Sequence, residues 1–256
     1  MRRSSFLVIG LVLTSFEAAH DLALPALGQT PAPAGRHRAV QSPPAKTIVS
    51  KTLILTPSKD NTLFQTFDGS LSNGAGAHLF AGATSGFQLR RALIAFDVAA
   101  QIPQGSTITS VTLVLSGSRS IADTESMELH RVTADWGQGS SDAGASRDGV
   151  GSQSKTGDAT WIHTFFPDRR WTKAGGDFDA VADAVADVPG FGESKWRSSA
   201  ALIARVQDWL NHPAANFGWI VIGDETTFRT AKRFDSREVV PDLTRPTLTV
   251  AFDTRQ

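Results

Sequence analysis

The strongest constraint on the fold is a period-two alternation of apolar and polar residues that recurs along the chain. Six segments show it: 52–56, 90–97, 109–117, 218–225, 231–238 and 245–252. Such spacing is typical of β-strands that place one face on a core. Turn-forming pairs such as Asp68-Gly69 and Asn73-Gly74 lie between the segments, and no βαβ alternation occurs. The sequence therefore predicts an all-β fold, either an antiparallel sandwich or a barrel.

One short helix is expected in the last quarter of the chain. Five apolar residues recur there at helical spacing: Leu202, Ile203, Val206, Trp209 and Leu210. Ser198 or Ser199 can cap its N-terminus, and Pro213 ends it. We expect Trp209 to anchor this helix to the core.

A long loop excursion is expected over residues 137–195, which are rich in Gly, Ser, Asp and Ala and poor in periodicity. Long loops in compact domains are usually functional or disordered. This segment contains Trp161, Trp171 and the Phe165-Phe166 pair. Because a disordered segment would leave these large rings in water, we expect the loop to be ordered over one end or face of the sheet structure.

The first 46 residues divide into two segments that precede the predicted β domain, residues 47–256. Arg2 and Arg3 followed by the apolar run Phe6–Phe16 indicate a secretory signal peptide, residues 1–28, with cleavage after Gly28. The run is too short to span a bilayer, which needs about 20 residues, so no membrane insertion of the mature chain is expected. Residues 29–46 contain four prolines and are expected to form an extended linker. These features predict a secreted protein, extracellular, periplasmic or at the cell surface.

Composition excludes several classes of function. The chain has no cysteine, which rules out a disulfide scaffold, thiolate catalysis, a cysteine zinc site and a lipidated cysteine anchor. It has 25 basic and 25 acidic residues, and this balance argues against a nucleic-acid partner.

Several segments resemble one known family in their order along the chain. They are 52–65, 90–97, 128–139, 156–166, 175–179 and the strands after residue 218. Together they are similar to the DNRLRE-domain family of secreted bacterial proteins, which overlaps carbohydrate-binding module family 96. Asp60-Asn61-x-Leu63 corresponds to the start of the motif that names the family, whereas Phe64-Gln65 departs from it. The resemblance implies a jelly-roll-like β-sandwich on an exported protein and makes polysaccharide binding the expected function.

Trp and Phe are the only aromatic side chains that could stack on a sugar, because the chain has six Trp and no Tyr. Aromatic faces attract the apolar C–H faces of sugar rings. Trp136, Trp161 and Trp171 are the candidates, because they lie at a strand end or in the long loop. The alternative is that these rings pack beneath the loop.

Basic residues of one predicted strand are the second set of candidates. Lys232, Arg233 and Arg237 could contact the acidic or hydroxyl groups of a glycan, because guanidinium groups bind carboxylate or sulfate in a bidentate manner. The alternative is a ladder of cross-strand ion pairs, for example between Arg91 or Arg237 and Glu238 or Asp235.

Turn residues with oxygen ligands could hold a structural calcium ion, the only cofactor considered. The candidates are Asp60, Asn61, Asp68, Asp177, Asp179, Asp224 and Glu225. No EF-hand loop is present, and turn chemistry explains most of these residues equally well. The sequence therefore assigns no metal ligand.

Catalytic patterns are weak throughout the chain. It contains neither G-x-S-x-G nor H-E-x-x-H, and its histidines are not at metal-ligand spacing. Asp177 and Asp179 could face one way as a glycosidase pair, although acids in such a position are more often turn residues. We therefore expect a non-catalytic domain that binds an extracellular or cell-envelope polysaccharide. The alternatives are a surface-assembly protein that packs on a protein partner, and a polysaccharide lyase or hydrolase.

Overall fold

The computed structural model describes residues 46–144 and 146–255. The predicted signal peptide, residues 1–28, and all of the predicted linker except Lys46 lie outside the described residues. Within the described part of the chain, no helix has the length and apolar character needed to cross a membrane.

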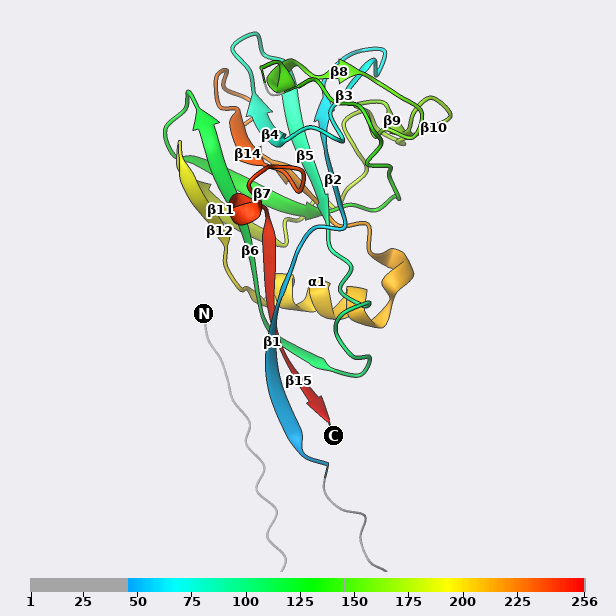
Figure 1. The fold of residues 1–256 in the computed structure, drawn as a ribbon, viewed down its shortest axis with the longest axis vertical. Helices are drawn as coiled ribbons and strands as arrows, with labels where there is room; N and C mark the ends of the chain where they lie inside the picture. The colour runs from blue at the N-terminus through cyan, green and yellow to red at the C-terminus, as the bar shows by residue number, and fades with distance from the viewer. Residues whose placement is uncertain (1–45, 145, 256) are drawn as a thin grey trace, which may run out of the picture. The chain divides into compact units, whose positions relative to one another are not determined.

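The described chain consists mainly of β-strands with one α-helix, as the alternation predicts (Figure 1). The strands are β1 (Ile48–Leu55), β2 (Lys59–Phe64), β3 (Leu71–Ser72), β4 (His78–Ala83), β5 (Leu89–Ala95), β6 (Thr107–Ser120), β7 (Glu125–Arg131), β8 (Ser152–Gln153), β9 (His163–Phe165), β10 (Arg169–Arg170), β11 (Ala184–Val188), β12 (Gly192–Trp196), β13 (Trp219–Ile222), β14 (Lys232–Asp235) and β15 (Thr247–Arg255). The helix is α1 (Ala200–Asn211), and three short 3-10 helices are η1 (Asp148–Val150), η2 (Pro213–Ala215) and η3 (Asp242–Thr244).

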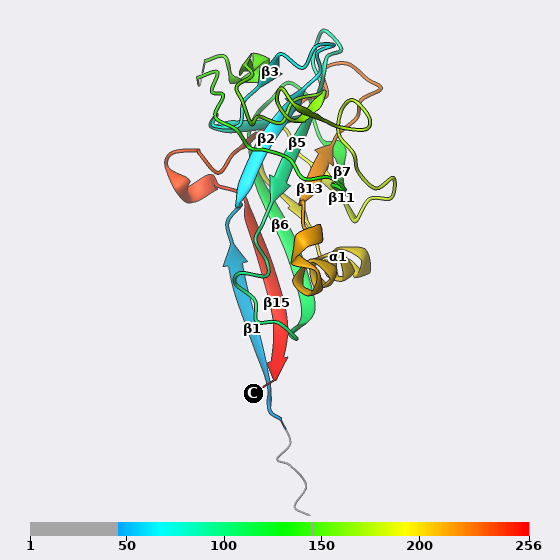
Figure 2. The ribbon, with the colours of Figure 1, turned by 90° about the vertical axis from the view of Figure 1, so that its right-hand side faces the viewer.

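One antiparallel sheet forms the body of the domain. Its strands follow the order β1-β15-β6-β14-β4-β5-β13-β7-β11, with β12 beside β6 and β2 beside β5. The nine-stranded path is strongly curled into a half-barrel, and Figure 2 shows β1 and β15 running side by side away from its upper part. The prediction of an antiparallel all-β fold with one helix is confirmed at this level.

Strand β4 joins the two parts of the sheet. Its residues 78–81 pair with β14, whereas Gly82 and Ala83 pair with β5. Gly82 has a φ of 108°, and a Cβ atom there would lie 2.9 Å from the carbonyl oxygen of Thr230. Glycine is therefore needed at this point, because only glycine adopts such a backbone and allows the close approach.

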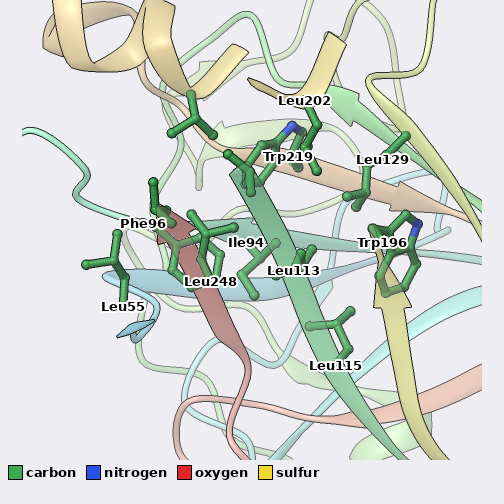
Figure 3. Packing of buried hydrophobic residues seen from close by; sticks show 14 of the residues in the cluster. Leu55, Ile94, Phe96, Leu113, Leu115, Leu129, Trp196, Leu202, Trp219 and Leu248 are labelled. Carbon is green, nitrogen blue, oxygen red and sulfur yellow. The ribbon is translucent and has the colours of Figure 1, made fainter. Parts of the chain in front are cut away.

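The larger core lies inside the curled sheet and beneath α1 (Figure 3). Ser199 caps the helix by accepting a hydrogen bond from the backbone N–H of Leu202 at 3.1 Å, as predicted. The ring centroids of Trp209 and Trp219 lie 4.4 Å apart, so the helix is anchored to β13. The buried positions on the strands are those of the predicted alternation, including Leu113, Leu115 and Leu248, which Figure 3 labels.

A second, smaller core lies on the opposite face of β2, β5 and β13, where the segment after β7 folds back over the sheet. Leu63, Leu93 and Ile220 contribute the sheet side of this cluster. The segment differs from the expected loop over 137–195, because its last part contains β11 and β12, which belong to the main sheet. These two strands carry small and charged residues rather than an apolar alternation, and for this reason the sequence did not reveal them.

Candidate functional site

The three tryptophans expected to stack on sugar are all buried in the smaller core. Trp136, Trp161 and Trp171 are 1%, 7% and 5% exposed. The indole N–H of Trp136 donates to the carbonyl of Phe217 at 2.8 Å, and that of Trp171 donates to the carbonyl of Thr160 at 2.9 Å. Their ring faces are therefore occupied by protein, and this arrangement corresponds to the alternative in which the rings pack beneath the loop.

Arg91 holds the loop in this position. Its guanidinium binds the carboxylate of Glu225 through two hydrogen bonds of 2.7 Å and donates a third to the carbonyl of Gly175, also at 2.7 Å. The same group lies 4.9 Å from the ring centroid of Trp161 and 5.3 Å from that of Phe178. The ion pair expected for Arg91 thus exists, but its partner is Glu225 rather than Glu238 or Asp235.

Lys232 is a buried structural residue. It is 2% exposed, and its ammonium donates to the backbone carbonyls of Ala122 and Asp123. Burial lowers the pKa of Lys232, while the nearby carboxylates of Glu125 and Asp123 act in the opposite direction. The ammonium can add positive charge to its surroundings, but two of its three donors are occupied by these carbonyls.

Arg237 belongs to a polar cluster that connects β2 to the C-terminal strands. Its backbone N–H donates to the Asp60 carboxylate at 2.8 Å, and its guanidinium donates to Gln138 at 3.1 Å and Glu238 at 3.3 Å. Asp60 is 1% exposed. Burial, followed by the Glu238 carboxylate, raises the pKa of Asp60 well above its ordinary value, although the hydrogen bond from Arg237 opposes this shift.

Asn61 is the centre of a second part of this cluster. Its fully buried amide donates to the carbonyls of Gln138 at 2.8 Å and Ala159 at 3.3 Å and to the hydroxyl of Ser72 at 3.0 Å. Its carbonyl accepts from the backbone N–H of Thr62 at 2.7 Å. The Asp60-Asn61 motif therefore fastens the long loop and the C-terminal strands to β2.

Like Lys232, Arg233 lines an open pocket. It lies on β14 between Phe80 of β4 and Arg119 of β6, which are its direct neighbours on the two flanking strands. We name this depression of ≈ 330 Å³ the cationic pocket. Its charged and apolar lining consists of Phe80, Arg119, Ile121, Arg147, Asp148, Val150, Lys232 and Arg233.

In the part of the chain that the structure describes, the arginines of the cationic pocket have no acidic partner, because the carboxylate of Asp148, which lines the same pocket, contacts His78 instead. Within the described residues, Arg119, Arg147 and Arg233 form no ion pair within 4.0 Å. Arg233 donates only to the hydroxyl of Ser118, at 3.0 Å. Like charges placed directly opposite each other on neighbouring strands destabilise a sheet. Arg119 and Arg233 are such a pair, and a bound anion would relieve their repulsion.

His78 positions the third arginine. Its Nδ1 atom contacts the carboxylate of Asp148, and its Nε2 atom lies 3.5 Å from that of Asp235. Asp148 begins η1, directly after Arg147, so this contact ties the segment that carries Arg147 to β4. Both ring nitrogens of His78 thus face carboxylates rather than the pocket.

The acids considered as calcium ligands have other partners. Asp68, Asp177 and Asp224 accept hydrogen bonds from backbone N–H groups of their own turns. Hydrogen bonds from the hydroxyls and backbone N–H groups of Thr226 and Thr227 lower the pKa of Asp224 to about 2. Asp179 and Glu225 form ion pairs with arginines. The described residues contain no group of three or more His, Cys, Asp or Glu side chains that could hold a metal ion.

The sequence alone did not identify Arg119 and Arg147 as site residues. Arg119 lies two positions beyond the predicted strand 109–117, in the part of β6 that continues to Ser120. The register that places Arg119 beside Arg233 involves a strand more than 100 residues away. No local pattern specifies this pairing.

A scan against models of known protein families finds no match for this chain, and a search of curated proteins finds none either. The resemblance to the DNRLRE-domain family therefore stays a prediction.

Proposed function

We propose that this protein is an exported, non-catalytic carbohydrate-binding β domain that binds an acidic extracellular or cell-envelope polysaccharide in the cationic pocket. The observation that carries this proposal is the facing pair Arg119 and Arg233, which lies beside Arg147 and has no carboxylate partner within the described residues. Guanidinium groups bind carboxylate and sulfate through paired hydrogen bonds, so such a pair suits an acidic sugar.

The other residues that line the pocket favour a sugar rather than a simple anion as the ligand. Phe80 forms part of its lining, and the exposed side chains of Ile121 and Val150 stand beside it. Ligand pockets combine apolar surface with a few convergent polar groups, and their volumes begin at about 300 Å³. A sugar offers both an apolar C–H face and polar substituents, whereas inorganic phosphate offers no apolar surface.

The wider setting is consistent with this proposal. The curled antiparallel sheet and its two cores support the finer description as a jelly-roll-like sandwich. The predicted signal peptide supports export, and the resemblance to the DNRLRE-domain family supports polysaccharide recognition. These two expectations come from the sequence, and they are part of the proposal.

The proposal can be tested by measuring the binding of polygalacturonate, heparin and dextran to the purified chain by calorimetry. We expect an acidic polymer to bind, dextran to bind much more weakly, and added salt to weaken the acidic complex. Arg119→Ala and Arg233→Ala are each expected to reduce affinity by about tenfold or more, because a charge-assisted hydrogen bond contributes about 1.5–3 kcal/mol. Arg197→Ala, which removes an exposed arginine outside the cationic pocket, is the matched control.

Stability measurements distinguish a binding role of the arginines from a structural one. Because Arg119 and Arg233 repel each other, Arg119→Ala should leave the free energy of unfolding unchanged or raise it. The proposal is wrong if dextran binds as tightly as the acidic polymers, or if neither arginine affects affinity. Release of reducing ends or unsaturated products would instead support the lyase or hydrolase alternative.

A further inference from the structure

Two exposed phenylalanines from different loops form a pair near the cationic pocket. Phe87 lies in the turn between β4 and β5, and Phe228 lies in the loop between β13 and β14. Their ring centroids are 5.9 Å apart at an angle of 40°, and the residues are 54% and 50% exposed. Single exposed apolar residues are common on protein surfaces. Two rings brought together from separate segments, with half of each in water, call for a specific explanation.

The backbone that presents these rings adopts an unfavourable conformation. Phe87 has a φ of 62° and Arg229, directly after Phe228, has a φ of 66°; they are the only non-glycine residues of the described chain with a positive φ. This region is disfavoured for residues with large side chains, and such conformations concentrate at functional sites.

Hydrogen bonds fix both turns to the same atom. The backbone N–H groups of Phe87 and Arg229 each donate to the carbonyl of Thr84, both at 3.2 Å. The hydroxyl of Thr230 adds a further link by accepting from the N–H of Ala83 at 2.9 Å. The ring pair is therefore held in place before any ligand arrives, which reduces the entropy lost on binding.

The two segments that carry the ring pair also contribute residues to the cationic pocket. Thr84 and Ser85, which begin the turn that carries Phe87, line the pocket, and so does Ala231, which follows the loop of Phe228. Ser85 is exposed and lies two residues before Phe87 in the sequence. A linear polymer anchored by its acidic group on Arg119 and Arg233 can thus continue over the rings.

We propose that Phe87 and Phe228 form a second subsite, the Phe platform, which stacks against the apolar face of a neighbouring sugar ring in the same polysaccharide chain. This inference rests on the proposed function, because the cationic pocket fixes the chain that the platform then contacts. Phenylalanine has no hydrogen-bonding group, so the platform selects for an exposed C–H face rather than for particular hydroxyls. The ligand is accordingly an acidic polysaccharide that is bound along several sugar rings, and its affinity rises with its length.

The test compares oligosaccharides of different length on platform and control variants. Binding of di-, tetra- and hexagalacturonate, and of heparin fragments of matched length, is measured by calorimetry. Phe87→Ala and Phe228→Ala are expected to reduce the affinity for the longest oligosaccharide that binds by about tenfold, which corresponds to about 1.4 kcal/mol. The affinity for the shortest oligosaccharide should stay unchanged. Phe228→Leu, which keeps apolar bulk without an aromatic face, should weaken binding as well. Phe67→Ala removes a 95% exposed phenylalanine outside both sites and should have no effect.

The outcomes separate the platform from the pocket. If the Phe87→Ala and Phe228→Ala proteins bind long and short oligosaccharides like the unaltered protein while Arg233→Ala does not, the platform is refuted and the proposed function stands. If the unaltered protein binds no acidic oligosaccharide, both are refuted. If Phe87→Ala and Phe228→Ala abolish binding of short and long oligosaccharides alike and also lower the melting temperature, the ring pair supports the loops, and the platform is refuted.

Discussion

Replacing Trp136 separates a packing role from a sugar-binding role. The residue is 1% exposed, its N–H donates to the carbonyl of Phe217 at 2.8 Å, and the ammonium of Lys59 lies 4.3 Å from its ring centroid. Deleting a buried Trp side chain to Ala costs about 3–5 kcal/mol. The lost hydrogen bond adds about 1 kcal/mol, and the cation–π contact adds about 0.5 kcal/mol.

The sum is about 4.5–6.5 kcal/mol, which is comparable to the whole free energy of unfolding of many domains, about 5–15 kcal/mol. Trp136→Ala could therefore prevent folding. Trp136→Phe keeps an aromatic ring in the smaller core and loses mainly the hydrogen bond and part of the volume. We expect it to lower the free energy of unfolding by about 1–2 kcal/mol while leaving polygalacturonate affinity unchanged.

Urea unfolding followed by far-ultraviolet circular dichroism measures the free energy of unfolding, and calorimetry on the folded variant measures the affinity for polygalacturonate. Phe67→Ala is the control and should change the free energy of unfolding by less than about 0.5 kcal/mol, as exposed substitutions usually do. The packing interpretation is contradicted if Trp136→Phe unfolds at the same urea concentration as the unaltered chain but binds polysaccharide tenfold more weakly. That result would mean that the loop opens and that the ring contacts sugar.

Three further substitutions test the polar cluster and the bend in β4. Asn61→Ala removes the donor to the carbonyl of Gln138 and the acceptor of the backbone N–H of Asn73, and it should lower the free energy of unfolding in urea by about 2–4 kcal/mol. The pKa of Asp60 is raised in the folded protein, so the unfolded chain loses this proton at a lower pH, near 3.8. The free energy of unfolding therefore falls as the pH rises from that value to the folded pKa. Asp60→Asn should remove this decline, which melting temperatures measured from acidic to neutral pH would show. Gly82→Ala adds a Cβ atom 2.9 Å from a backbone carbonyl at a φ of 108°, whereas Gly105→Ala has a φ of 78° and open space around it, so Gly82→Ala should have the lower melting temperature and lose about 1–3 kcal/mol.

The sequence predicted the strands whose alternation directly reflects burial. The segment 109–117 lies within β6, the segment 245–252 overlaps β15, and the helix begins directly after its predicted cap, Ser199. By contrast, β2 was not identified as a strand because Asp60, Asn61 and Thr62 are polar and yet buried. Their burial is stabilised by hydrogen bonds to distant segments, which periodicity cannot reveal.

The candidate site was predictable only in part, for a related reason. Arg233 was identified from its own strand, but its partner Arg119 depends on a register shift between β14 and β6. Whether Trp161 faces sugar or core depends on the path of the long loop, which Arg91 and Glu225 determine through a contact across 134 residues of sequence. Both features arise from long-range pairing rather than from local pattern.

The residues that maintain the fold are separate from the residues proposed to bind the ligand. Asp60 and Arg237 are 177 positions apart and meet in the buried polar cluster, so these two residues maintain the fold. The residues proposed to bind ligand lie elsewhere: Arg119 and Arg233 near strand ends, Arg147 directly before η1, and the two phenylalanines in the loops that converge on Thr84. These loops are anchored to Thr84 and to Ala83 of β4 by backbone hydrogen bonds and do not contribute to either core cluster. Because the two sets of residues are separate, the ligand can change through substitutions in these loops while the fold and its buried cluster stay intact.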